Sequence, residues 1–423
     1  MSAVRRVLLL ATTTGYQIRS FGEAAEACGV RLVFASDRCD RLDDPWWDQA
    51  IPVRFQREDF STAAIVKAFA ARPPAGIIAV GDRPTVLAAH AAAAFGLPGN
   101  PPAAAAASRN KLAARSAFRA AGLLTPEYRD VLIDADPRAL ARDVSYPAVV
   151  KPLALSGSRG VMRVDNEREF ATAFERLRAL LQSPDIRIEQ DPAHERALVE
   201  SFVPGREFAI EGVLTDGVFT PLAIFDKPDP LDGPFFEETI YLTPSREAAE
   251  VQRAMVEAVA AAARALRLCH GAVHAECRVN GHGVYVLEVA ARPIGGLCST
   301  ALRFSAPGGA TVSLEEVLLR HAIGQDIRAY VRETAASGVM MIPIPRGGVY
   351  RGVAGVEEAR AVAHVEDVRV TAKLDSLMVP LPEGRSYLGF IFARAGEPAT
   401  VERALREAHA RLGFTIEKGL TVL

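Results

Sequence analysis

The sequence predicts an α/β and α+β protein that begins with a parallel βαβ domain and ends in an α+β module. Two observations carry this prediction: apolar runs alternate with helical patterns over the first hundred residues, and strands mix with one long helix after residue 339. At 423 residues the chain is too long for one compact core. We therefore expect three domains: residues 1–109, residues 110–330 with a smaller subdomain at about 128–200, and residues 331–423.

The N-terminal domain is predicted from five segments in strand–helix order. Apolar runs at Val7–Leu10, Arg31–Ala35 and Gly76–Val80 have the length of buried strands, and Ile18–Cys28 and Leu87–Phe95 have helical spacing. Strands that alternate with helices pair in parallel, with helices on both faces of the sheet. The Pro/Gly break at Gly96–Pro102 and the alanine run at Ala103–Ala107, near the end of this domain, are read as its edge.

The middle of the chain changes pattern at residue 110. A basic amphipathic helix is expected at Lys111–Ala121, ended by Gly122. The other elements expected here are helices at Glu167–Leu181 and Gln252–Leu268 and strands at Ala148–Lys151, Ala197–Glu200 and Glu207–Leu214. The tail is expected to form a separate module, with strands at Val368–Ala372 and Tyr387–Ala393 and a helix at Thr400–Leu412.

Composition excludes several classes of partner. Apolar residues make up 49% and the net charge is -2, with Lys and Arg scattered, which argues against a nucleic-acid surface. No stretch approaches the roughly 18 apolar residues of a membrane span. The five cysteines, one of them Cys39, are odd in number and form no C-x-x-C pair. We therefore expect a cytoplasmic protein with neither a nucleic-acid nor a membrane partner.

A hairpin around His282 carries the most informative pair of acids. Glu276 and Glu288 are equidistant from its turn, so they should be cross-strand partners on one face. Two carboxylates so placed repel each other unless a cation or a proton lies between them. Oxygen ligands without His or Cys in register favour Mg²⁺. The three histidines nearby, His270, His274 and His282, are interpreted as structural or surface residues.

This hairpin and the residues that follow it resemble a motif of the ATP-grasp family. The acid Glu276, the turn, and the run from Val286 to Gly296, which reads V-L-E-V-A-A-R-P-x-G-G, are similar to the metal motif of that family. Ala290 stands where most members carry a third, metal-side Asn, so the number of metal ions stays open. The resemblance implies an ATP-grasp fold that binds ATP with Mg²⁺, or alternatively Mn²⁺.

The same resemblance extends upstream to a nucleotide site. Lys111, and Lys151 with the glycine-rich segment after it, look like the two phosphate lysines and the flap of the family. A Lys is a point charge for phosphate, and glycine amides approach phosphate oxygens closely. The flap residues implied are Ser156, Gly157, Ser158 and Gly160. The segment from Leu198 resembles the adenine hinge, which implies that Glu200, Phe202 and Val203 meet the adenine and Glu207 the ribose.

Within this family the chain resembles L-amino-acid (dipeptide) ligases of the bacilysin-synthetase kind. The insertion Phe225–Ser245 looks like their acidic substrate loop, and it places Glu238 and Tyr241 where those ligases carry an acid and a His. The expected catalytic residues are Arg292, Lys151, Glu238 and Tyr241. Arg292 is the candidate for holding the substrate carboxylate, because its planar fork suits a carboxylate and an acyl-phosphate.

The predicted function is an ATP-dependent ligase that joins a carboxylate, expected to be that of an amino acid, to an amine. An acyl-phosphate would form first, with release of ADP and phosphate. Two alternatives stay open: a biotin-carboxylase-like or purine-pathway carboxylating enzyme of the same fold, and a nucleotide-binding regulator without activity. The expected partners are small-molecule substrates and a second copy of the chain in a homodimer.

Overall fold

The computed structural model describes residues 4–12, 17–37 and 50–418. Cys39, which entered the prediction of a reducing compartment, lies outside these residues. The other four cysteines, Cys28, Cys269, Cys277 and Cys298, are free thiols. In the described part of the chain, every helix is too short or too polar to cross a membrane.

The N-terminal domain is built on a parallel sheet with the strand order β3-β2-β1-β4. Its elements are β1 (Arg5–Ala11), α1 (Ile18–Ala27), β2 (Val30–Ser36), β3 (Ile51–Pro52), α2 (Glu58–Ala68), β4 (Gly76–Val80) and α3 (Pro84–Phe95). Both faces are covered, because Val7 and Leu9 enter one hydrophobic core while Leu8 and Leu10 enter another. The predicted βαβ pattern is confirmed, although β3 and α2 were not anticipated.

Two helices, α4 (Pro102–Arg109) and α5 (Lys111–Ala120), lead out of this domain. The alanine run read as a domain edge therefore lies within a helix, because Pro at its first turn and consecutive alanines favour helix. The Asn110 side chain caps α5 by accepting from the Leu112 and Ala113 amides at 3.0 and 3.1 Å. This cap places Lys111 in the first turn of α5.

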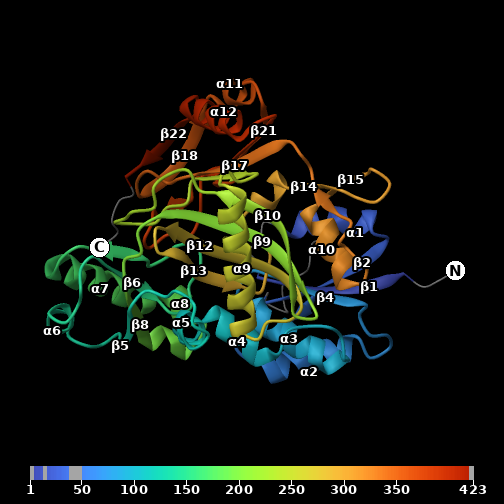
Figure 1. The fold of residues 1–423 in the computed structure, drawn as a ribbon, viewed down its shortest axis with the longest axis horizontal. Coiled ribbons are helices and arrows are strands. Elements are labelled where there is room, and N and C mark those ends of the chain that lie inside the picture. Colours follow the sequence, from blue (N-terminus) through green and yellow to red (C-terminus); the bar gives the residue numbers. More distant parts are fainter. Residues whose placement is uncertain (1–3, 13–16, 38–49, 419–423) are drawn as a thin grey trace.

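The next segment forms a small antiparallel sheet of order β5-β8-β6-β7, which we call the lid. Its elements are β5 (Tyr128–Leu132), α6 (Pro137–Ala141), β6 (Ala148–Pro152), β7 (Met162–Val164), α7 (Glu167–Leu181), α8 (Pro184–Arg187), η1 (Pro192–Glu195) and β8 (Arg196–Ser201). Phe170, Phe174 and Leu177 of α7 are fully buried against it. In Figure 1 the lid is the green region on the opposite side of the molecule from the N-terminal sheet.

An eight-stranded antiparallel sheet of order β13-β12-β9-β10-β11-β17-β21-β19 forms the centre. The elements of the middle region are β9 (Arg206–Thr215), β10 (Val218–Asp226), β11 (Ile240–Thr243), α9 (Ala249–Ala265), β12 (Gly271–Asn280), β13 (Gly283–Ala290), η2 (Cys298–Ala301), β14 (Arg303–Ser305), β15 (Thr311–Ser313), α10 (Leu314–Ala322) and β16 (Val331–Arg332). One core joins this sheet to the N-terminal domain, since it contains Val7, Leu9, Val339 and Phe390 together. That shared core holds the two regions in a fixed relation.

The tail extends the same central sheet. Its elements are β17 (Ala336–Ile342), β18 (Gly348–Ala354), α11 (Val356–Arg360), β19 (Val365–Val370), β20 (Leu377–Met378), β21 (Gly389–Ala395), α12 (Pro398–Ala410) and β22 (Gly413–Glu417). The expected C-terminal α+β module has a core largely of its own, and it is continuous with the central sheet, because β17 pairs with β11 and carries β21 and β19 beside it. Only β18, β20 and β22 form a sheet of their own, under the red helices at the top of Figure 1.

Candidate active site

A cleft of about 740 Å³ runs between the lid, the central sheet, the N-terminal domain and the tail. Its volume is within the range of small-molecule sites, which is roughly 300–1,000 Å³. All predicted site residues line it except Gly160. The Gly160 amide donates to the Pro382 carbonyl at 2.8 Å, and a Cβ at this position would lie 3.0 Å from both Leu177 and Leu180. In the structure Gly160 thus anchors the flap, and its expected contact with nucleotide stays a prediction.

Lys151 of β6 lies at the lid side of the cleft, paired with a buried acid. Its Nζ is 2.5 Å from Glu200 Oε2, and the Arg115 Nε donates to Glu200 Oε1 at 2.7 Å. Burial lowers the pKa of Lys151 to about 8, although Glu200 opposes that shift. Burial would raise the pKa of Glu200, but Arg115 and Lys151 lower it, so the carboxylate stays charged. In the structure Glu200 therefore holds Lys151 in position.

The hinge between the lid and the central sheet follows Glu200. The Phe202 amide donates to the Pro147 carbonyl, and the Val203 carbonyl accepts from Arg278. Among the described residues, the Phe202 carbonyl and the Val203 amide have no hydrogen-bond partner. One free acceptor beside one free donor matches the edge of an adenine ring, as expected for the backbone of this hinge.

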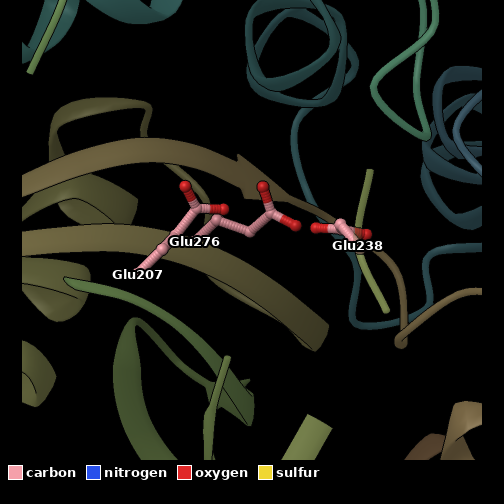
Figure 2. Close-up of side chains that lie close together, drawn as sticks. All are labelled: Glu207, Glu238 and Glu276. Atoms are coloured by element: carbon pink, nitrogen blue, oxygen red, sulfur yellow. The ribbon is translucent and has the colours of Figure 1, made fainter. Parts of the chain in front are cut away.

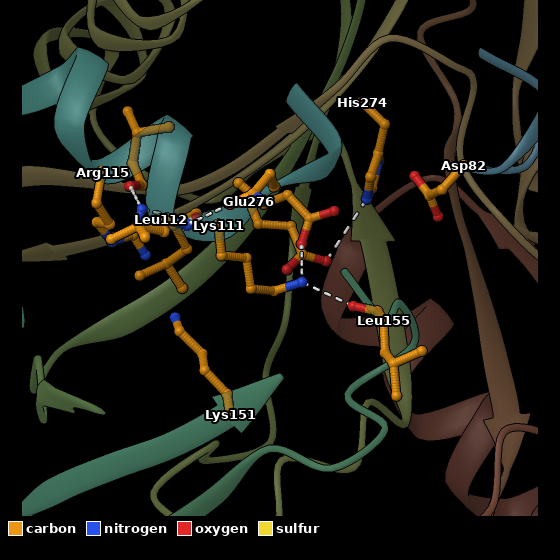
Figure 3. A network of polar contacts seen from close by, with 12 residues as sticks. Asp82, Lys111, Leu112, Arg115, Lys151, Leu155, His274 and Glu276 are labelled. Carbon is orange, nitrogen blue, oxygen red and sulfur yellow. Dashed lines mark hydrogen bonds and ion pairs between the residues drawn. The ribbon is translucent and has the colours of Figure 1, made fainter. Parts of the chain in front are cut away.

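Lys111 approaches the same space from α5 (Figure 3). Its Nζ donates to the Leu155 carbonyl at 2.7 Å and lies 3.7 Å from Glu288 Oε2. The flap segment Ser156–Ser158 follows Leu155 and lines the cleft. Lys111 is thus held at the residue before the flap, and both lysines line the cleft together with the flap, an arrangement that suits a polyphosphate.

The predicted pairing of the two hairpin acids is confirmed: Glu276 of β12 is the register partner of Glu288 of β13. A β-bulge follows Glu276, where the register shifts at Cys277. Both carboxylates line the cleft, Glu276 beside Lys227 and Glu288 beside Lys111. The donor set consists of oxygens, which suits a hard divalent cation.

A second group of acids gathers around a buried lysine. Lys227 Nζ lies 2.8 Å from Glu207 and 3.1 Å from Glu276, and it also bonds Glu238. Figure 2 shows these three carboxylates close together, and their oxygens lie within 4.8 Å of one another. Glu207, expected at the ribose, is thus engaged by Lys227 and by Arg278 at 2.8 Å. Sequence reasoning placed Lys227 in the insertion but assigned it no role.

The pKa values of the charged groups in this cluster are strongly shifted. Burial, with Glu276 nearby, raises the pKa of Glu238 to about 7 despite Lys227. Burial would also raise the pKa of Glu276, but Lys227 and His274 bring it well below its ordinary value. Burial opposes the charge of Lys227, yet the three acids raise its pKa well above the usual range. Glu238 is therefore the carboxyl group of this cluster that can exchange a proton near neutral pH.

His274 was interpreted as structural or surface, and the structure places it in the wall of the cleft. It is buried, lines the cleft, bonds Glu211 through Nδ1, and has Nε2 3.5 Å from Glu276 Oε1. Its register partner on β13 is Ala290, the position at which Asn was expected. Burial opposes its charge, but Glu211 and Glu276 raise the pKa of His274 to about 9. His274 precedes Glu276 by two residues, and residues two apart on a strand point to the same face of the sheet. This spacing could have predicted that His274 lies in the cleft beside Glu276.

Arg292 is held by an acid from the N-terminal domain. Its Nε and Nη2 donate to the two Asp82 oxygens at 2.9 and 3.1 Å, and Nη1 donates to the Pro293 carbonyl at 3.0 Å. Burial opposes the charge of Asp82, but Arg292 lowers its pKa to about 2. Asp82 was missed, although it follows the carboxyl end of β4, where sites form in parallel sheets.

The tail supplies an apolar wall of the cleft. Met341 of β17 and Phe390 of β21 are register partners, and Tyr387 packs on Phe390 with ring centroids 6.2 Å apart. Tyr241, predicted to face substrate, is almost fully buried on β11 and lies under Lys227, whose Nζ is 5.1 Å from the ring. An apolar wall opposite charged groups suits a ligand with an apolar side chain and a polar head.

The lowered pKa of Lys151 predicts a specific pH dependence. Above pH 8 the nucleotide-free enzyme loses this positive charge, so the KM for ATP should rise by roughly tenfold between pH 7 and pH 9. A Lys151→Arg variant stays charged over this range and should show a flat profile, whatever its absolute KM. Steady-state kinetics at saturating second substrate measure both profiles. An equal rise in the variant would show that another group titrates.

Comparison with known proteins agrees with this geometry. Residues 144–301 match the model of the ATP-grasp domain, residues 22–99 match that of the ATP-grasp N-terminal domain, and residues 340–417 match the L-amino acid ligase C-terminal domain 2. The solved L-amino acid ligase from Bacillus licheniformis superposes with a TM-score of 0.82 at 26% identity, covering 99% of this chain and 100% of that one.

Two curated relatives match this chain over only part of their own length. Alanine–anticapsin ligase of Bacillus subtilis is 29% identical over 48% of this chain and 45% of its own, and protein y4rH of Sinorhizobium fredii is 25% identical over 76% and 64%. The chain thus spans less than two thirds of the length of either relative.

Proposed function

We propose that this chain, an ATP-grasp protein similar to L-amino-acid ligases, is an ATP-dependent ligase that joins a carboxylate to an amine. The observation that carries the proposal is the shared cleft, where phosphate lysines, paired acids and the clamped Arg292 meet. ATP would phosphorylate the carboxylate of an amino acid, and the amine of a second one would displace phosphate. The product is then a dipeptide, formed with release of one ADP and one phosphate.

The nucleotide would lie between the lid and the central sheet. The hinge backbone at Phe202 and Val203 would offer one acceptor and one donor to adenine, and Lys111 and Lys151, which line the cleft with the flap, would contact the phosphates. Glu276 and Glu288 would hold Mg²⁺, or Mn²⁺ in its place. When bound, the cation neutralises charge on the phosphates.

Arg292 would receive the substrate carboxylate. Guanidinium has five N–H donors; Asp82 takes two of them and the Pro293 carbonyl takes one. One donor on each of Nη1 and Nη2 is left, which can hold a carboxylate in two parallel bonds. The same two N–H donors can stay bonded to the substrate oxygens while the carboxylate is converted to the acyl-phosphate.

The chemical step is a pair of displacements. A carboxylate oxygen attacks the γ-phosphorus and ADP leaves; the amine nitrogen then attacks the acyl carbon and phosphate leaves. The amine must lose a proton, and Glu238, which lines the cleft and whose pKa burial raises to about 7, would take it. Burial, with Glu238 beside it, raises the pKa of Tyr241 well above its usual range, so its hydroxyl stays protonated.

A screen for phosphate release tests this function. The protein with ATP and Mg²⁺, in buffer freed of carbon dioxide, should release ADP and phosphate only when particular pairs of amino acids are added. Turnover that needs bicarbonate would favour the carboxylating alternative. ATP binding without turnover for any of the 20 amino acids and their pairs would favour a regulator.

Location and assembly belong to the same proposal. Four described cysteines are free thiols, which supports a reducing compartment such as the cytoplasm. The homodimer rests on resemblance to other ligases and is tested by light scattering of the purified chain.

A further inference from the structure

One arginine in the cleft stands apart from the other cations. Six of the lysines and arginines that line the cleft have a carboxylate within ion-pair distance: Arg83, Lys111, Lys151, Arg159, Arg278 and Arg292. The seventh cation among the described residues that line the cleft is Arg385, which has neither an ion pair nor a hydrogen-bond partner. The carboxylate of Asp185, which also lines the cleft, interacts with the charge of Arg385 over a longer range, but its direct contacts are with Arg159 at 2.9 Å and Ser183 at 2.7 Å.

The loop that carries Arg385 is anchored on both sides. The Pro382 carbonyl accepts from the Gly160 amide and the Glu383 carbonyl accepts from Arg159, each at 2.8 Å. The Glu383 carboxylate is bound by both ends of the Arg176 fork at 2.9 Å. Gly384 follows in a turn so tight that a Cβ there would lie 1.8 Å from the Val379 carbonyl oxygen. The loop therefore presents Arg385 from a fixed backbone.

Arg385 also stands beside the apolar wall. Tyr387, two residues later, packs on Phe390, and Phe390 is the register partner of Met341. A free guanidinium at one end of an apolar wall complements an amino acid, whose carboxylate and side chain diverge from one carbon.

We propose that Arg385 receives the α-carboxylate of the amino acid that supplies the amine, and so determines the preference of the cleft for amino acids over simple amines. This inference rests on the proposed ligase function. It also explains which carboxylate is phosphorylated. An amino acid that attacks through its nitrogen brings a second carboxylate into the cleft, and that carboxylate must not react. Arg292 is committed to the reacting carboxylate, and a different cation must keep the second one away from the γ-phosphate.

The test compares amino acids with their α-amides as amine substrates. The carboxylate donor is first identified by hydroxamate formation, with hydroxylamine as the amine. A panel of the 20 L-amino acids and the matching panel of α-amides are then supplied as amines to the wild type and to Arg385→Gln. The wild type should prefer amino acids to their amides by roughly 10- to 100-fold in kcat/KM, the value of one charge-assisted contact.

In Arg385→Gln this preference should fall to within about threefold, through a rise in the KM for the amino acid. Hydroxamate formation and the KM for ATP should keep their wild-type values, and Arg385→Lys should recover part of the preference. Arg253→Gln, which removes an exposed arginine from α9, is the matched control.

A variant that keeps the full preference would overturn the assignment. So would a loss of hydroxamate formation or a raised KM for ATP, since either would assign Arg385 to the nucleotide phosphates. Wild-type protein that forms no hydroxamate with any carboxylate would instead remove the proposed function itself.

Discussion

Replacing Glu288 by Gln should lower kcat by at least about 100-fold, because a cation that bridges phosphate oxygens loses an anionic ligand. The fold should be unaffected: Glu288 is only partly buried, and its one described ion pair is the 3.7 Å contact with Lys111. The free energy of unfolding should therefore change by less than about 1 kcal/mol. Phosphate release at saturating substrates and urea denaturation give the two quantities.

A loss of metal affinity should accompany the loss of turnover. Titration of Mn²⁺ into the protein with ADP should show weaker binding in Glu288→Gln than in the wild type. Glu257→Gln, on the exposed face of α9, serves as the control for loss of one carboxylate. Wild-type turnover in Glu288→Gln would remove the assignment of the metal to the hairpin.

Substituting Arg292 by Lys should also reduce turnover on the order of 100-fold. Lys keeps the positive charge and can still pair with Asp82, but it has no second N–H edge to hold a carboxylate in two bonds. The loss should appear in hydroxamate formation as well, because the acyl-phosphate, which Arg292 would stabilise, forms before either hydroxylamine or the amine substrate attacks.

The exposed Arg328, which lies on the surface beside Asp326, gives the matched control as Arg328→Lys. Hydroxamate yield and the KM for the carboxylate donor separate two outcomes. A raised KM with unchanged kcat would mean that Arg292 binds substrate without stabilising the acyl-phosphate. Unchanged values for both would contradict its role as the carboxylate clamp.

Local pattern predicted the hairpin acids correctly for a physical reason. Equal distance from a turn fixes the partner in a regular antiparallel pair, so Glu276 and Glu288 could be paired from the sequence. The two lysines, Lys111 and Lys151, came instead from the resemblance to ATP-grasp motifs, and both line the cleft with the hairpin acids. The ATP-grasp fold itself, predicted from the order of these motifs, is confirmed.

Partners that lie far apart in sequence were not predictable in this way. Arg292 and Asp82 are 210 positions apart, and they meet because one hydrophobic core joins the N-terminal domain to the central sheet. Lys227 comes within reach of Glu276, 49 positions later, only once β10 and β12 flank β9. No periodicity in a single sequence encodes such contacts.

The continuation of the central sheet was missed for a related reason. β11 pairs with β17 across nearly a hundred residues, and both strands are short apolar runs that could equally begin a new sheet. This pairing brings the tail, with Tyr387 and Arg385, to the cleft.

The central claim is that the carboxylate is phosphorylated before the amine attacks, and oxygen transfer tests it most directly. The identified carboxylate donor, labelled with ¹⁸O in its carboxyl group, would be incubated with ATP, Mg²⁺ and the amine in buffer freed of carbon dioxide. We predict one ¹⁸O atom in each phosphate released, because the attacking carboxylate oxygen leaves with phosphorus. Amide formation with unlabelled phosphate would contradict the acyl-phosphate mechanism.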